Sequence, residues 1–297
     1  TYLQSQVQQQ WVQRYNGSGN RLDEAYSLFV DGSRNVYVTG WSVGSGTSGF
    51  DYATIKYDSS GVQRWAQRYN GPGNNLDEAY SLSVDGSGNV YVTGRSVGSG
   101  TTGFDYATVK YNSAGVQQWV QRYNGPGNGV DEPRSLKVDG SGNVYVTGHS
   151  MGSGSYYDYA TVKYSSSGVQ QWVQRYDGSG NADDDARSLS VDGSGNVYVT
   201  GHSMGSGTNY DYATIKYNSA GVQQWIQRYT GQGNYVDTAT AVSVDGLGNV
   251  YVTGGSWGSD TTRFDYATIK YNSAGVQQWV QRYNGPTGNG DDGGTDL

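Results

Sequence analysis

Residues 85–124 read DGSGNVYVTGRSVGSGTTGFDYATVKYNSAGVQQWVQRYN, and this stretch recurs with small changes along the chain. The tryptophan of its last motif stands at positions 11, 65, 119, 172, 225 and 279, so the spacing is 53 or 54 residues. The NVYVTG motif begins five times, and so does the DYAT motif. The 297-residue chain therefore contains five complete copies of one repeat and an additional tryptophan motif at its start.

Each copy contains four short runs rich in Val, Ile, Thr, Tyr or Trp, which Gly, Asn, Asp and Ser separate. In the first copy these runs cover residues 25–31, 35–42, 51–57 and 62–69. Such runs predict β-strands, and no helical period is present. One four-stranded sheet cannot bury both of its faces, whereas sheets packed radially can. The sequence therefore predicts an all-β, five-bladed β-propeller with four antiparallel strands per blade.

The repeat also predicts the domain organisation. We expect one propeller domain over residues 1–284, with blades at approximately 17–70, 71–124, 125–177, 178–230 and 231–284. Residues 285–297 are rich in Gly and Asp, and we expect a flexible tail there.

The outermost strand is duplicated, because residues 7–15 repeat the fourth strand of a blade. We expect the five blades to close alone, with two chains forming a ring of ten as the alternative. One terminal strand would close the ring and the other would be spare, and a spare strand edge can pair with another molecule. The candidate residues for self-association are Trp11, Tyr15, Trp279 and Tyr283.

Composition excludes several classes of function. The net charge of -7 disfavours binding to nucleic acid or to an anionic membrane, because both require a basic surface. The chain has no Cys and no run of 18 apolar residues, and we expect no signal peptide in its first ten residues.

The connections between strands differ in length. The first-to-second and third-to-fourth connections are tight turns, whereas the other two are long, so both long loops lie at one face. The residue after each VTG motif varies: Trp41, Arg95, His149, His202 and Gly255. An aromatic residue precedes each DYAT motif, and the fifth copy adds a tryptophan: Phe50, Phe104, Tyr157, Tyr210, Phe264 and Trp257. These side chains favour a carbohydrate ligand on the long-loop face, and the alternative is neutral variation in exposed loops.

Catalysis and metal binding find less support in the sequence. The two histidines, His149 and His202, occupy equivalent positions in adjacent copies, which we expect to be too far apart for zinc. One aspartate recurs in each fourth-to-first connection: Asp23, Asp77, Asp131, Asp184 and Asp237. Five equivalent carboxylates offer no pair in unequal environments, so we expect turn capping, no enzymatic activity and no cofactor. A calcium ion on the central axis, held by these aspartates, is the alternative.

The run GNVYVTGxSxGSGTxxxDYATxKYxSxGVQQWVQRYNG resembles the SBBP-type bacterial β-propeller repeat over roughly residues 7–284. It is also distantly similar to NHL-type blades through the pattern D-x-x-G-N-V-Y-V. The family name implies seven blades, whereas this chain carries five copies. The resemblance implies an extracellular or cell-surface protein.

Together these observations predict a non-catalytic binding or adhesion scaffold. Its partner would be a glycan or protein on the long-loop face, with no nucleic acid and no membrane insertion. The alternative function is a stalk or filament subunit that assembles through the duplicated terminal strands.

Overall fold

The computed structural model describes residues 8–44, 49–98, 103–154, 156–205, 207, 209–232, 234–258 and 264–284. These residues form five sheets of four antiparallel strands each, and in every sheet the strands follow one another in sequence order. The predicted all-β propeller of five blades is therefore confirmed.

The strands have nearly the same bounds in every blade. The first blade contains β1 (Asp23–Val30), β2 (Val36–Val43), β3 (Phe50–Tyr57) and β4 (Gln63–Tyr69). The second contains β5 (Asp77–Val84), β6 (Val90–Val97), β7 (Phe104–Tyr111) and β8 (Gln117–Tyr123). The third contains β9 (Asp131–Val138), β10 (Val144–Met151), β11 (Tyr157–Tyr164) and β12 (Gln170–Tyr176). The fourth contains β13 (Asp185–Val191), β14 (Val197–Met204), β15 (Tyr210–Tyr217) and β16 (Gln223–Tyr229). The fifth contains β17 (Asp237–Val244), β18 (Val250–Trp257), β19 (Phe264–Tyr271) and β20 (Gln277–Tyr283).

The tight turn between the first two strands of a blade is held by its aspartate. Oδ1 of Asp85 accepts the amides of Ser87 and Asn89 at 2.9 and 3.0 Å, and Oδ2 accepts the hydroxyl of Tyr91 at 3.0 Å. Gly88 takes the left-handed backbone conformation that this turn requires, with φ at 77°. The DGSGN motif is therefore a self-capped hairpin turn, as the sequence predicts.

Each blade is joined to the next by its tryptophan. The indole of Trp65 lies on Gly115, in the turn between β7 and β8, where an added Cβ would come within 2.8 Å of the ring. Its Nε1 donates to the carbonyl of Ser113 at 3.2 Å, and its ring lies 6.2 Å from that of Tyr111. This tryptophan therefore lies between two blades.

Buried tyrosines complete the interface between blades. Tyr37 and Tyr52 of the first blade pack with Ala79, Leu82 and Val90 of the second. The hydroxyl of Tyr52 donates to the carbonyl of Ala107 at 3.1 Å. The same packing recurs at the later junctions, so the apolar core is a series of four similar interfaces.

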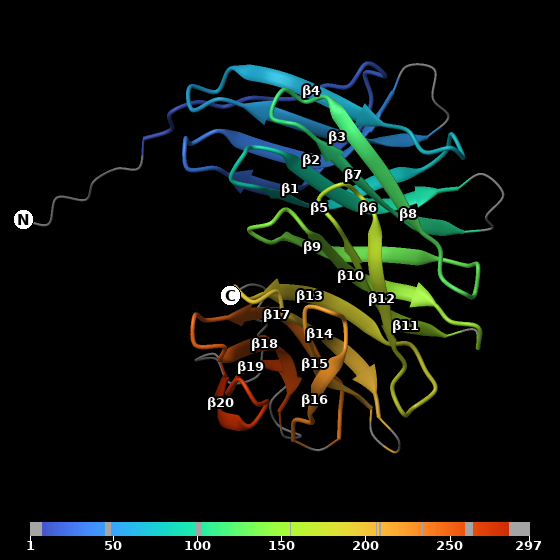
Figure 1. The fold of residues 1–297 in the computed structure, drawn as a ribbon, viewed down its shortest axis with the longest axis vertical. Helices are drawn as coiled ribbons and strands as arrows, with labels where there is room; N and C mark the ends of the chain where they lie inside the picture. The colour runs from blue at the N-terminus through green and yellow to red at the C-terminus, as the bar shows by residue number, and fades with distance from the viewer. Residues whose placement is uncertain are drawn as a thin grey trace, which may run out of the picture.

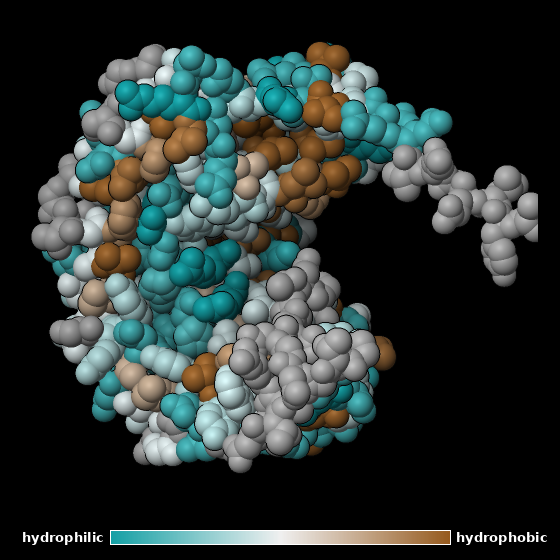
Figure 2. Space-filling model, turned by 180° about the vertical axis from the view of Figure 1, so that it is seen from behind, coloured by the Kyte–Doolittle hydropathy of each residue, from teal (hydrophilic) through white to brown (hydrophobic). Residues whose placement is uncertain are grey.

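The five blades form an open arc rather than a closed ring (Figures 1 and 2). Among the described residues, no further blade covers the outer faces of the first and fifth blades: Leu28 in β1 is exposed, and so are Trp279 and Tyr283 in β20. The expectation that five blades close alone is therefore wrong for this structure. The angle between consecutive blades is set by how the tyrosines and tryptophans pack, and this packing leaves a sector of the circle open.

The predicted N-terminal strand does not form a ladder in the described residues 8–15. This segment instead lies against the first blade, where Trp11 donates Nε1 to the carbonyl of Ser59 at 3.3 Å and lies on Gly61. Residue 7 and the tail predicted at residues 285–297 lie outside the described residues. No helix long and apolar enough to cross a bilayer occurs among the residues that are described.

We predict that Trp119→Ala and Trp279→Ala differ in their effect on stability. Trp119 packs against the next blade, so its loss should lower the free energy of unfolding by about 3 kcal/mol. Trp279 has no following blade in the described structure, so its loss should cost under about 1 kcal/mol. Urea denaturation of both variants in dilute solution measures the difference, and equal losses would contradict this account of the interface.

Candidate functional site

The residue after each VTG motif lies in the second strand of its blade, opposite a residue of the first strand. This pair lies at the long-loop end of the blade. Strand register sets this pairing because the long loops enter the first strand and leave the second. The five pairs are Glu24 with Trp41, Glu78 with Arg95, Glu132 with His149, Asp185 with His202 and Thr238 with Gly255.

A third varying position lies two residues further along the first strand of each blade. It holds Tyr26, Tyr80, Arg134, Arg187 and Thr240 in chain order. Beside Glu24, the first blade therefore carries aromatic residues, whereas the next three blades carry ionisable residues and the fifth carries small ones. Blades that are otherwise nearly identical differ here, so this end of the concave side is the candidate functional site.

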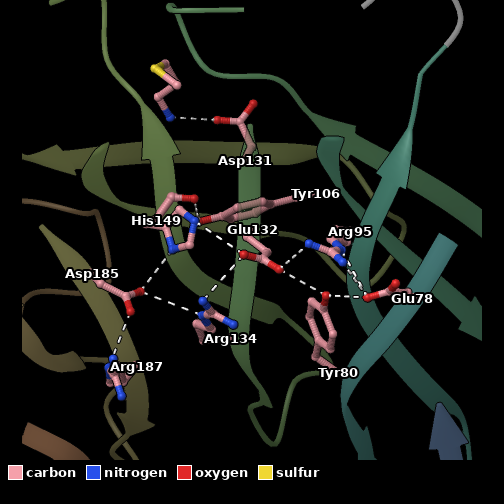
Figure 3. Close-up of polar contacts among 11 residues, drawn as sticks. Glu78, Tyr80, Arg95, Tyr106, Asp131, Glu132, Arg134, His149, Asp185 and Arg187 are labelled. Carbon is pink, nitrogen blue, oxygen red and sulfur yellow. Dashed lines mark hydrogen bonds and ion pairs between the residues drawn. The ribbon is translucent and has the colours of Figure 1, made fainter. Parts of the chain in front are cut away.

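The second and third blades are linked by Arg95. Its guanidinium contacts Glu78 at 2.8 Å and Glu132 of the next blade at 2.9 Å (Figure 3). The hydroxyl of Tyr80 lies 2.7 Å from Glu78 and 3.0 Å from Glu132. Arg95 also lies over the ring of Phe104, 4.4 Å from its centroid. A cation between two largely buried carboxylates compensates their charges and fixes their positions.

His149 links the third and fourth blades. Its Nδ1 lies 3.1 Å from Asp185, and its Nε2 lies 3.5 Å from Glu132 (Figure 3). Arg134 approaches the same two carboxylates at 3.4 and 3.7 Å, and Arg187 approaches Asp185 at 3.3 Å. We call these eight residues the polar cluster: Glu78, Tyr80, Arg95, Glu132, Arg134, His149, Asp185 and Arg187.

Ionisable groups at this site are shifted in opposite directions. Burial would raise the pKa of Asp185, but the hydrogen bond with His149 and the nearby cations Arg134 and Arg187 hold that pKa at about 2. Burial lowers the pKa of His202 to about 4. Its Nδ1 is buried with no hydrogen-bond partner among the residues described. At neutral pH the site therefore contains an ionised Asp185 beside a neutral His202.

The predicted ligand-binding residues come together, but they contact one another. His149 packs edge-on against Tyr157 at 4.6 Å, and His202 packs against Tyr210 at 4.9 Å. Trp41 is buried against Phe50, with ring centroids 4.0 Å apart.

In the fifth blade Trp257 lies between Tyr235 and Phe264, at 5.3 and 5.0 Å. In all five blades, the aromatic residue before DYAT therefore supports a varying residue of the second strand. Less of its ring is available to a ligand than the sequence suggests.

Sequence reasoning missed six members of the polar cluster: Glu78, Tyr80, Glu132, Arg134, Asp185 and Arg187. The signal was present, because the residues one and three places after the repeated aspartate vary between copies in the same way as the residue after VTG. Placing the start of the first strand two residues too late assigned the acidic members to a loop.

Four of the five repeated aspartates begin the first strand of their blade, and Asp184 directly precedes β13. Each accepts the amide of the glycine six residues earlier, at 2.6 to 3.1 Å. Asp77, Asp131, Asp184 and Asp237 are almost fully buried, and burial raises the pKa of Asp77 and of Asp184 to about 6. One oxygen of each aspartate therefore caps the turn that precedes its strand.

Within the described ranges, one group of carboxylates could hold a metal ion. Oxygens of Asp158, Asp177 and Asp184 lie within 4.8 Å of one another at the junction of the third and fourth blades. Asp158 also pairs with Arg175 at 2.6 Å, and Asp184 accepts the amide of Gly178 at 2.6 Å. Protein donors therefore already engage two of the three carboxylates.

Comparison with known proteins agrees with the repeat and its fold. The family described as "Beta-propeller repeat" matches residues 10–46, 64–100, 118–154, 171–207 and 224–260, which confirms the SBBP-type resemblance. No protein with a curated description matches the chain.

Solved structures of similar shape include enzymes. The periplasmic gluconolactonase PpgL of Pseudomonas aeruginosa is 14% identical, with 87% of this chain and 71% of that chain covered and a TM-score of 0.53. An ancestral GH74 enzyme is 13% identical, with 87% of this chain and 32% of that one covered and a TM-score of 0.52. The polysaccharide lyase Uly1 is 12% identical, with 94% and 76% covered and a TM-score of 0.49.

The prediction that this chain is not an enzyme is corrected by these structures, because the same architecture carries a gluconolactonase and a GH74 enzyme. The prediction compared only the five equivalent aspartates. The carboxylates of the polar cluster, by contrast, occupy unequal surroundings: Glu78 contacts Arg95, whereas Asp185 contacts His149. The fold and the site therefore leave catalysis open.

We predict that His202→Gln reduces the loss of stability in acid. The native pKa of about 4 lies below the usual 6.5, so between these values the unfolded chain binds a proton that the native chain does not. Above pH 6.5 this difference in proton binding does not affect the free energy of unfolding. As the pH falls to 4, it lowers the free energy of unfolding of the wild type by an amount on the order of 3 kcal/mol. Urea denaturation of both proteins at pH 7 and pH 4 measures it, and parallel pH profiles would exclude a buried neutral His202.

Proposed function

The chain belongs to the β-propeller repeat family, and we propose that it binds a carbohydrate at the long-loop end of its concave side. The observation that carries this proposal is the concentration of varying charged and aromatic residues at that one end of near-identical blades. Figure 2 shows hydrophilic side chains in the middle of the concave side, which agrees with a polar ligand.

Two arginines supply the donors for such a ligand. The side chains of Arg134 and Arg187 are 38% and 41% exposed, whereas their carboxylate partners are nearly buried. Each guanidinium carries five N–H donors, and ion pairs of 3.3 to 3.7 Å do not use them all. These donors suit hydroxyl or carboxylate oxygens of a sugar, which favours sugars that carry a carboxylate.

An apolar surface for the sugar ring is present on the first blade. The ring of Tyr26 is exposed and lies edge-on to that of Tyr80, 5.5 Å away. A ring face beside a few convergent polar groups is typical of sites that bind small polar ligands. In the first blade Tyr26, rather than the buried Trp41, is exposed for a sugar ring to stack on.

We also propose that the ligand is met outside the cell or on its surface, as the family resemblance implies. Protein ligands on the same face are included in this proposal, because exposed arginine and tyrosine side chains also dominate protein interfaces. Fractionation of the cells that produce the chain tests the location.

We predict that Arg134→Gln and Arg187→Gln each weaken carbohydrate binding about tenfold or more. Each change removes charge-assisted hydrogen bonds, worth about 1.5 to 3 kcal/mol, while leaving the buried carboxylates in place. A glycan array with neutral and uronic-acid oligosaccharides selects the probe, and isothermal titration with that oligosaccharide measures affinity.

The matched control is Arg64→Gln. Arg64 pairs with Asp58 near the opposite, tight-turn face and is more exposed than either site arginine. Its replacement should leave affinity unchanged. If no oligosaccharide is retained, or if the three variants bind alike, the carbohydrate site is not where we propose it.

A second candidate function is proton transfer on the bound sugar, which the position of His149 between Glu132 and Asp185 favours. Chromatography of the retained oligosaccharide after incubation would reveal new products. If the chain transfers a proton, His149→Asn should abolish product formation and preserve binding. If the wild type leaves the oligosaccharide unchanged, this candidate function is excluded and the binding proposal stands.

A further inference from the structure

The first blade ends the arc with an apolar face that no other blade covers among the described residues, and residues 8–15 cover only part of it. Leu28 of β1 is 63% exposed, whereas its equivalents in the next three blades, Leu82, Leu136 and Leu189, are buried by the preceding blade. A recess of about 310 Å³ lies beside it, lined by Val36, Val38, Ala53, Ile55 and Tyr57 among others. Hydrophobic side chains are visible beside the opening of the arc in Figure 2.

The fifth blade ends the arc with the opposite kind of face. In the inner blades the tyrosines equivalent to Tyr251 and Tyr266 are buried completely, as Tyr145 and Tyr159 illustrate. Tyr251 and Tyr266 are themselves only partly buried. Trp279 is 37% exposed. The fifth blade thus presents the aromatic side chains that the other blades insert into their neighbours.

The four internal interfaces show how these two faces fit. The tyrosine of each third strand donates to an alanine carbonyl of the next blade, at 3.1 to 3.4 Å. Each tryptophan donates to a serine carbonyl of the next blade, at 3.2 to 3.3 Å. An arginine of the next blade donates to the tyrosine that ends each fourth strand, at 2.8 to 3.2 Å.

All of these groups are present at the two ends of the arc. The fifth blade provides Tyr266, Trp279 and Tyr283, and the first blade provides the carbonyls of Ala53 and Ser59. From this correspondence we propose that the fifth blade of one copy docks on the first blade of a second copy. The contact would have the register and hydrogen bonds of an internal interface, and it goes beyond the proposed ligand site.

The N-terminal segment competes for this face. Trp11 donates to the carbonyl of Ser59, which is the acceptor that Trp279 of the incoming copy would use. Tyr15 packs on the cluster of Ala53, Ile55 and Tyr57. Residues 8–15 thus occupy the place of a preceding blade's fourth strand and fill only part of its interface.

The N-terminal segment, rather than β20, gives way during docking. Residues 8–15 have no ladder partner among the described residues, whereas β20 pairs along its length with β19. Displacing the segment loses contacts that Trp279 and Tyr283 replace in kind. The segment therefore acts as a weak cap on the docking face of the first blade.

The resulting contact is heterologous, because two different faces of the chain meet. Such a contact leaves one donor face and one acceptor face unused in every dimer, so it produces chains of copies unless their rotation closes a ring. This property separates the proposal from any symmetric dimer and provides its test.

The test uses two variants that each block one face. Leu28→Arg places a charge in the acceptor face, and Trp279→Asp places one in the donor face; both side chains are exposed in the single copy, so folding should be preserved. Sedimentation velocity from about 1 μM to about 1 mM should show oligomers that grow with concentration for the unsubstituted chain. Each variant alone should remain a monomer. An equimolar mixture of the two variants should form one-to-one dimers, because each retains the face that the other lacks.

The control is Leu247→Arg, which introduces the same charge at an exposed leucine in the turn between β17 and β18. It should assemble like the whole chain, and circular dichroism should show β-structure in all three variants. A monomeric whole chain throughout this range would overturn the proposal. So would self-association of either blocked variant, or a mixture that stays monomeric.

Weakening the cap should strengthen docking. We predict that Trp11→Ala lowers the concentration for half-maximal association by about tenfold, because the incoming Trp279 no longer displaces an indole. The same sedimentation series measures this shift. Association that is unchanged or weaker would show that the segment is not a competitor and would overturn this part of the proposal.

Discussion

The contact of a tryptophan with a glycine turn is the interaction on which the rest of the structure depends. The indole of each of the first four blades covers a glycine whose backbone is left-handed, at φ values of 81 to 86°. Only glycine combines that backbone with the space for a ring 2.8 to 2.9 Å from where its Cβ would be. The turn between the third and fourth strands therefore also positions the next blade, and a change at this glycine would disturb both.

Much of the fold could be predicted because every copy of the repeat has the same strand-forming residues and the same turn residues. Alternating β-formers with Gly and Asn turns predict the strands, and the tryptophan spacing predicts the number of blades. The angle between blades was not predictable, because it results from how Tyr37 and Tyr52 pack against Ala79 and Leu82. The open arc is a consequence of side-chain packing at four interfaces, which no single motif encodes.

The candidate site was half predicted. The variation at Arg95 and His149 was visible, whereas their partners Glu78, Glu132 and Asp185 were hidden by a strand start set two residues too late. Contacts across blades, such as that of Arg95 with Glu132, join residues 37 apart and need the three-dimensional arrangement. The residues that pack blades together are constant and preserve the scaffold. The residues at the long-loop ends of the first and second strands differ between copies without disturbing it. Binding and catalysis are both compatible with such a division.

The likeness of the four interfaces has a consequence for synthesis of the chain. A blade that emerges from the ribosome can pack on a blade of a neighbouring nascent chain as well as on the preceding blade of its own chain. Only the covalent loop between consecutive blades favours pairing within one chain, because it keeps the local concentration of the correct partner high. Crowded translation should therefore produce entangled chains more readily than it would for a propeller with dissimilar blades.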